Sequence, residues 1–209
     1  APPACDDRRV IDELERRSIP FVRLQPGGPL QSARAVLMDN ERAAFDMTSY
    51  LLSLGHHRIG FIVGDRGYAA SGQRLAGHVR ALSSAGVDID LDYVRQGQFD
   101  FDSGRAAADA LLNLPAPPTA IVASSDDLAA GVLAAAHRRG IAVPERLSVT
   151  GFDDAPLAQA VWPALTTVRQ PVRAMAAAAA DQLLDPAAEG ERRLGHEIVV
   201  RESTAPPGA

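Results

Sequence analysis

The chain has 209 residues, 46% of them apolar, and it carries 26 acidic against 21 basic side chains, for a net charge of −5. This length suits one large domain or two small lobes. Binding to nucleic-acid phosphates calls for clustered Lys and Arg, whereas the arginines here are scattered, so the composition speaks against a nucleic-acid binder. The single cysteine, Cys5, excludes an internal disulfide framework.

The sequence contains no targeting or membrane signal that we recognise. No run approaches the roughly 20 apolar residues that span a bilayer. The first residues lack the basic and apolar regions of a signal peptide, and the chain starts at Ala1 rather than Met, which indicates a trimmed protein. We expect a cytoplasmic location and no membrane contact.

Short apolar runs alternate with alanine-rich helical stretches along the chain. Glycines at helix ends and polar residues at helix starts mark the boundaries, with Asn40 expected as an N-cap and Gly55, Gly86 and Gly140 as stops. We expect strands near 19–24, 59–63, 93–99, 119–123 and 147–152, and helices near 40–54, 70–85, 102–113 and 126–139. Counted from about residues 21, 58, 93, 119 and 147, the strands begin 26 to 37 residues apart, which is typical of βαβ units. The fold class is therefore α/β, with parallel sheets flanked by helices.

The C-terminal part follows a different order. Leu165–Arg169 precedes Gln170 and Pro171, and Pro171 suits the first turn of a helix over about 172–184. We expect residues 185–193 to be a loop, 197–201 to be a last strand, and the tail to be irregular.

Parallel sheets bind ligands at the carboxyl ends of their strands, so the residues after each strand are the candidates for a site. Arg74 follows a glycine-bearing turn and offers a planar fork of donors to ligand oxygens; the alternative is a surface arginine at a helix start. Asp153 could accept two hydrogen bonds from sugar hydroxyls, or it could be a turn residue. Phe99 could stack on a sugar or a base, or lie in the core.

Other patterns argue against catalysis. The pair Asp126–Asp127 opens a helix, where a carboxylate is stabilised by the free N–H groups. Glycoside cleavage would need two carboxyl groups facing each other, and nothing in the sequence requires such a pair. The five histidines show no metal-ligand spacing, and no phosphate-binding glycine loop or nucleophile elbow is present. We expect no enzyme, no cofactor and no metal site.

Taken in order, many segments resemble the effector domain of the LacI/GalR (lactose/galactose repressor) family. Each is short, and together they cover nearly the whole chain with family spacing. They are Met38–Asn40, Leu54–Gly60, Ser71–Gly77, Ser103–Ala107, Pro118–Ile121, Ser125–Gly131, Val143–Val149, Gly151–Asp154, Leu165–Pro171 and Val200–Ser203.

The resemblance implies a two-lobe fold of the periplasmic-binding-protein type, which closes over a small molecule. It places residues 1–61 plus 171–193 in the first lobe and residues 62–170 plus 194–209 in the second. The three crossovers, near 61–64, 169–171 and 193–195, would form the hinge. The first lobe would be incomplete, because residues 2–7 look like a loop that follows a strand in the middle of that lobe.

Carried over by position, the resemblance makes Arg74, Phe99, Asp153 and Gln170 effector contacts. Ser125 stands where the family often has Asn, and this departure argues for a somewhat different effector. The implied effector is a sugar or a related small molecule.

The implied function is that of the ligand-sensing domain of a transcriptional regulator, in most cases a repressor. Effector binding would favour one lobe arrangement, which a homodimer transmits to DNA-binding heads. Operator DNA would be contacted only through a helix-turn-helix domain that is missing here, with about 120 residues absent upstream. Leu133, Val161 and Trp162 could serve the dimer interface or the core. The alternative function is a periplasmic sugar-binding protein of a transport system, which shares the fold.

Overall fold

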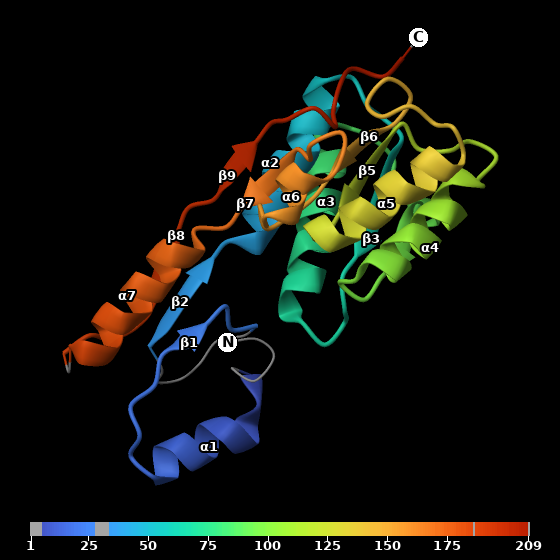
Figure 1. Ribbon diagram of the computed structural model, residues 1–209. Helices are drawn as coiled ribbons and strands as arrows, with labels where there is room; N and C mark the ends of the chain where they lie inside the picture. Colours follow the sequence, from blue (N-terminus) through green and yellow to red (C-terminus); the bar gives the residue numbers. More distant parts are fainter. Residues whose placement is uncertain (1–5, 28–33, 186, 209) are drawn as a thin grey trace.

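The computed structural model describes residues 6–27, 34–185 and 187–208. Two groups of strands and helices lie at opposite ends of the molecule, joined by a narrow middle part (Figure 1). Within the described residues, no helix has the length and apolar character needed to cross a membrane.

The larger group is built on a four-stranded parallel sheet in the order β4-β3-β5-β6. Its strands are β3 (Ile59–Val63), β4 (Val94–Gln96), β5 (Ala120–Ala123) and β6 (Ser148–Thr150). Every residue of β3, β5 and β6 is buried, as expected for a parallel sheet covered on both faces.

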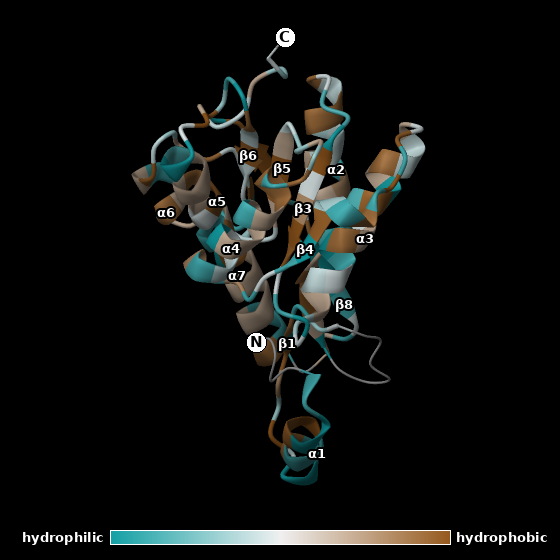
Figure 2. Ribbon diagram, turned by 90° about the vertical axis from the view of Figure 1, so that its right-hand side faces the viewer, coloured by the Kyte–Doolittle hydropathy of each residue, from teal (hydrophilic) through white to brown (hydrophobic). Residues whose placement is uncertain are grey.

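Helices cover both faces of this sheet (Figures 1 and 2). One face carries α2 (Asn40–Ser53) and α3 (Ala69–Ser84), and the other carries α4 (Phe101–Leu112) and α5 (Asp126–Arg138). One apolar core lies beneath α4 and α5, around Ile121 and Leu128, and another lies beneath α2 and α3, around Leu51 and Phe61. The short segments η2 (Leu91–Tyr93) and α6 (Leu157–Ala160) complete this group.

The smaller group is a three-stranded parallel sheet in the order β1-β2-β8. It comprises β1 (Arg23–Leu24), β2 (Ala35–Met38) and β8 (Glu191–Leu194), with α7 (Val172–Leu184) packed against it. The helix α1 (Arg8–Arg16) precedes β1; of its apolar side chains, Ile11 is buried, Leu14 is half-buried and Val10 is exposed.

Two strands join the sheets. The strands β7 (Thr167–Arg169) and β9 (Glu197–Val199) pair antiparallel between the groups, and bridges link Thr150 to Thr166 and Asp153 to Arg169. A third apolar core, around Met38, Met47 and Phe152, lies at this junction.

The α/β class and the parallel order of the larger sheet confirm the sequence-based expectation, and Gly55, Gly86 and Gly140 all adopt positive φ after their helices. Other expectations were wrong. Residues 191–194 form β8 rather than a loop, because backbone pairing with β2 suffices for an exposed, charged edge strand. The N-cap of α2 is Asp39, whose carboxylate accepts from the Arg42 amide; Asn40 is the first helical residue.

The strand expected over 19–24 is reduced to its last two residues, and the helix α1 and the strand β2 were not predicted. The expected lobe boundary between residues 61 and 62 falls inside β3, all of which pairs within the larger sheet, so residues 59–61 belong to that sheet. Residues 2–5 of the expected loop lie outside the described residues.

Candidate functional site

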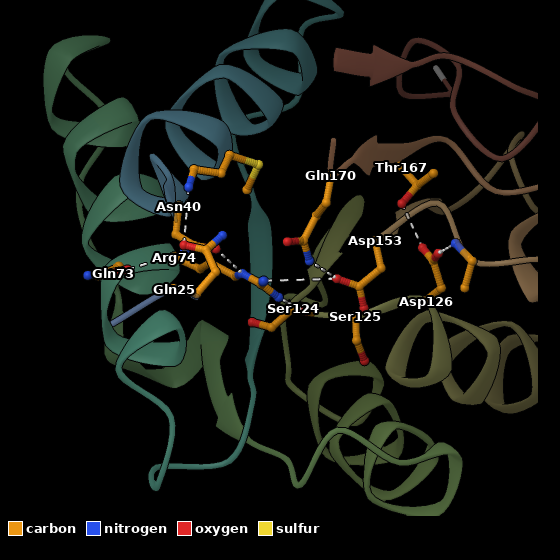
Figure 3. Close-up of polar contacts among 12 residues, drawn as sticks. Gln25, Asn40, Gln73, Arg74, Ser124, Ser125, Asp126, Asp153, Thr167 and Gln170 are labelled. Atoms are coloured by element: carbon orange, nitrogen blue, oxygen red, sulfur yellow. Dashed lines mark hydrogen bonds and ion pairs between the residues drawn. The ribbon is translucent and has the colours of Figure 1, made fainter. Parts of the chain in front are cut away.

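The carboxyl ends of the strands in the larger sheet converge on one buried arginine. Arg74 comes from the first turns of α3, Ser124 and Ser125 follow β5, Asp153 follows β6, and Gln170 follows β7. Figure 3 shows the side chains of Arg74, Asp153 and Gln170 directed toward one another. Arg74 is only 6% exposed, which contradicts the alternative of a surface arginine.

Arg74 is held on three sides. Its Nε donates to Asn40 Oδ1 at 3.0 Å and its Nη1 donates to the carbonyl of Ser124 at 2.5 Å. The guanidinium lies over the ring of Phe152, 3.5 Å from the centroid. Burial lowers the pKa of Arg74 to about 10. The negative charges of Asp153 and Asp126 act in the opposite direction, because they favour the charged guanidinium. The group therefore stays positively charged at neutral pH.

Asp153 faces this arginine across a gap that a ligand hydroxyl could bridge. Its Oδ1 lies 3.9 Å from Arg74 Nη2 and accepts a hydrogen bond from Gln170 Nε2 at 2.5 Å. Burial raises the pKa of Asp153, while the Arg74 charge and the Gln170 hydrogen bond lower it. The side chain is 37% exposed, so part of the carboxylate faces open space.

Phe99 and Ser125 lie at the edge of this arrangement. Phe99 has a φ of 61°, and its half-buried ring lies 6.0 Å from the Arg74 guanidinium and edge-on to Tyr68. Ser125 is buried, and its hydroxyl is the N-cap of α5, accepting from the Leu128 amide at 3.2 Å. The structure thus places Phe99 beside Arg74 and gives Ser125 a structural role.

Asp126 is the first residue of α5, as expected, and its carboxylate is directed to the loop after β6 and to β7. It is fully buried, and its carboxylate accepts from Thr167 Oγ1 at 2.6 Å and from the Ala155 amide at 2.7 Å. Burial raises its pKa to about 6, although both hydrogen bonds oppose the rise. Asp126 thereby joins α5, the loop after β6, and β7.

Three amide side chains that the sequence analysis missed extend the site toward the smaller sheet. Asn40 Nδ2 donates to Gln73 Oε1 at 3.3 Å and to Gln25 Oε1 at 3.5 Å, so they form a row that ends at Arg74. Beside them lies a hollow of about 360 Å³. Its lining comes from the carboxyl ends of β1 and β2, from β8 and from α3, and comprises Gln25, Pro26, Gly27, Leu37, Met38, Asp39, Asn40, Glu41, Gln73, Glu191 and Arg193.

The signal that could have found this row is the strand rule itself. Asn40 lies two residues after the end of β2, and Gln25 follows β1 directly. Recognising Ala35–Met38 as a strand would have directed attention to residues 39–41.

The comparisons with known proteins agree with the observed fold. Residues 48–204 match the family model described as a periplasmic binding protein-like domain. The transcriptional repressor CytR of Escherichia coli K12 is 39% identical over 197 residues, covering 92% of this chain and 58% of the repressor. The chain therefore spans less than two thirds of that relative's length.

Solved structures give the same result. A LacI family transcriptional regulator from Mycobacterium smegmatis is 34% identical with a TM-score of 0.85, covering 97% of this chain and 76% of that one. A complex of the transcriptional regulator CelR with cellobiose is 32% identical with a TM-score of 0.85, covering 95% of this chain and 63% of that one. These relatives are named as regulators, which favours that reading over a transport protein.

Proposed function

We propose that this chain, which belongs to the LacI family of transcriptional regulators, is the ligand-sensing part of a DNA-binding repressor. The effector would be a small molecule bound between the two lobes, and its binding would control the affinity of the whole protein for operator DNA. DNA contact would come from a further domain of the whole protein, and the regulator would act in the cytoplasm.

The observation that carries the proposal is the set of polar groups around Arg74. The buried guanidinium, the part-exposed Asp153 carboxylate and the amides of Gln170, Asn40 and Gln73 present donors and acceptors in one place. A sugar ring presents hydroxyl groups that both donate and accept hydrogen bonds. The donors and acceptors around Arg74 match such hydroxyl groups. The CelR complex shows that a relative of this fold is a sugar binder.

The charge of Arg74 is already balanced by the Asp153 carboxylate, and its Nη1 already donates to the Ser124 carbonyl. The described part of the site therefore favours an uncharged sugar over a phosphorylated or acidic one, because an anion would compete with Asp153 for the same guanidinium.

The test begins with thermal-shift measurements of the chain against neutral monosaccharides and disaccharides, including ribose and cellobiose, and their phosphorylated forms. The Kd of each binder is then measured by calorimetry. Asp153→Asn is expected to weaken binding at least tenfold, because it loses a charge-assisted acceptor of ligand hydroxyls. Asp109→Asn, in α4 and remote from the site, is the control. Equal affinities in the two variants would refute the site assignment.

We further propose that the regulator is a homodimer. Trp162 is 84% exposed and borders a hollow of about 200 Å³ that Leu133, Ile141, Val143 and Pro163 also line. Leu133 is buried and Val161 packs against the core beneath α5, which leaves Trp162 as the main exposed candidate of the three apolar positions considered. Sedimentation equilibrium of the chain measures the association.

A further inference from the structure

The loop after β6 is bent in a way that its residues do not favour. Asp153 and Asp154 are consecutive non-glycine residues with φ values of 118° and 55°. Such conformations are sparsely populated for residues with a side chain and persist only where the surroundings hold them. The side chain of Asp153 faces Arg74, so whatever holds this bend also sets the direction of the candidate effector carboxylate.

Two neighbouring pairs of side chains connect this loop to the end of β7. On the side of the site, Gln170 donates to Asp153. On the opposite side, Arg169 Nε donates to Asp154 Oδ2 at 2.6 Å. Asp153 and Asp154 are adjacent in the chain, as are Arg169 and Gln170. The contact between Arg169 and Asp154, the outer pair, therefore fixes the spacing of the contact between Gln170 and Asp153, the inner pair.

The outer pair belongs to a larger ionic network. Arg201, which follows β9, donates to the other oxygen of Asp154 and also to the Leu165 carbonyl at 2.7 Å. Arg169 also donates to Glu197 at 2.7 Å, at the start of β9. The Asp154 side chain is only 6% exposed. The network therefore reaches both strands that join the two sheets.

We propose that Asp154 is a positioning residue, which holds Asp153 toward Arg74 and ties the candidate effector site to β7 and β9 through Arg169 and Arg201. The proposal rests on the effector site proposed above. It assigns no ligand contact to Asp154 itself. A change in the spacing of β7 and β9 during lobe movement would act directly on the direction of Asp153.

The electrostatics of Asp154 support an ionised carboxylate. Burial, the largest single influence, raises its pKa, but the hydrogen bonds and charges of Arg201 and Arg169 together outweigh burial and lower it. At neutral pH, the network therefore contains two carboxylates and two guanidiniums, and charge-assisted hydrogen bonds of this kind are the strong ones.

The test is amide hydrogen exchange of the chain without any ligand. The Asp153 amide donates to the Val168 carbonyl and the Gly151 amide to the Thr166 carbonyl, so both report local opening of the loop from β7. In Asp154→Asn we expect these amides to exchange about tenfold faster, from the loss of two charge-assisted hydrogen bonds. Asn tolerates positive φ, so the variant changes the ionic contacts and not the backbone preference.

The matched control is Asp109→Asn, because Asp109 also accepts from an arginine, Arg139 at 2.9 Å, on the far helices α4 and α5. It should leave the exchange of the Asp153 and Gly151 amides unchanged. If Asp154→Asn fails to fold, Arg169→Met carries the same test, since Arg169 is 45% exposed and its loss is tolerated more easily.

The proposal is overturned if the Asp153 and Gly151 amides of a folded variant exchange as slowly as those of the parent chain. Since no effector is used, failure of the Asp153→Asn binding experiment and failure of this one are distinguishable. The first removes the effector role of Asp153, and the second removes the role of Asp154 in holding it.

Discussion

The residue on which the candidate site depends most, after Arg74, is Asn40. It is 3% exposed and its Oδ1 is the acceptor for Arg74 Nε, while its Nδ2 faces the two glutamines. A buried donor that loses its partner costs about 1–3 kcal/mol, more when it is charged. The position therefore links the stability of the fold to the geometry of the site.

We predict that Asn40→Ala lowers the free energy of unfolding by about 1–3 kcal/mol, because Arg74 Nε is left without an acceptor in a buried place. Asn40→Asp keeps the acceptor and should lose less, although it gives up the donors to Gln25 and Gln73. Urea denaturation of both variants measures the difference. If Asn40→Asp were as damaging as Asn40→Ala, the Arg74 hydrogen bond would not be the important contact.

At the same scale, sequence reasoning singled out Arg74, Phe99 and Asp153 because they follow strands or open helices of one parallel sheet, and the family resemblance added Gln170, which follows β7. Sequence reasoning could not assign the contacts of residues whose side chains have two possible partners. Asp126 and Ser125 both open α5, and only the three-dimensional structure shows that Ser125 caps the helix while Asp126 turns to Thr167 and Ala155.

At the scale of elements, the close approach of paired helices depends on glycine. A Cβ at Gly77 of α3 would lie 2.0 Å from the Glu41 carbonyl of α2, and one at Gly131 of α5 would lie 2.2 Å from the Phe101 carbonyl of α4. Both contacts are with backbone, which cannot move aside as a flexible side chain could. The α2–α3 pair is therefore held close at Gly77, and the α4–α5 pair at Gly131 and also at Gly104, where a Cβ would lie 2.4 Å from the Leu128 carbonyl.

We predict that Gly77→Ala destabilises the protein by about 1–3 kcal/mol, as overpacking does. The control lies in the same helix, since a Cβ at Gly72 would meet nothing within 4 Å. Gly72→Ala should stabilise the protein by about 0.5–1 kcal/mol through its better helix propensity. Thermal unfolding should move the two variants in opposite directions, and a shared direction would contradict the packing argument.

The elements that the sequence predicted well are those whose apolar residues recur with a clear period and end at glycine, such as β3 and α3. Those it missed lack that signal. The four apolar residues of β2 are too few to show a period, and β8 consists largely of charged residues. Both strands form because their backbones pair in a sheet whose partners are far apart in the sequence.

For the whole molecule, the antiparallel pair β7–β9 and the segment before β3 are the connections between the two sheets. The boundary expected at residue 61 illustrates why a resemblance indicates lobes more readily than their exact limits. Motif spacing follows the chain, whereas a sheet boundary is set by hydrogen bonds between strands, and Ile59 to Ile62 pair with Ala120 to Ala123.

The stability of the whole molecule should depend on pH through a histidine buried between α2 and α3. His78 is 2% exposed, bonds to Thr48 Oγ1 at 3.0 Å, and packs against the Phe61 ring. Burial lowers its pKa to about 3. Between pH 6.5 and pH 3 the unfolded state therefore binds a proton that the folded state does not, so stability is lost as the pH falls below 6.5.

Asp126 acts in the opposite sense. Its pKa is raised from 3.8 to about 6, so the folded state binds the extra proton, and stability is gained as the pH falls through 6. The two groups partly cancel in the parent chain, and a comparison of variants is needed to separate them. Replacing His78 alone removes its contribution and leaves that of Asp126.

We predict that the parent chain loses about 2 kcal/mol more than His78→Gln when the pH is lowered from 7 to 5, since a pKa difference converts at about 1.4 kcal/mol per unit over this range. Urea denaturation at pH 7, 6 and 5 measures it. His137→Gln, at an exposed position of α5, is the control and should follow the parent. Parallel pH profiles for His78→Gln and the parent would mean that His78 does not stay neutral in the folded protein, and the packing of α2 on α3 would then have to accommodate a buried cation.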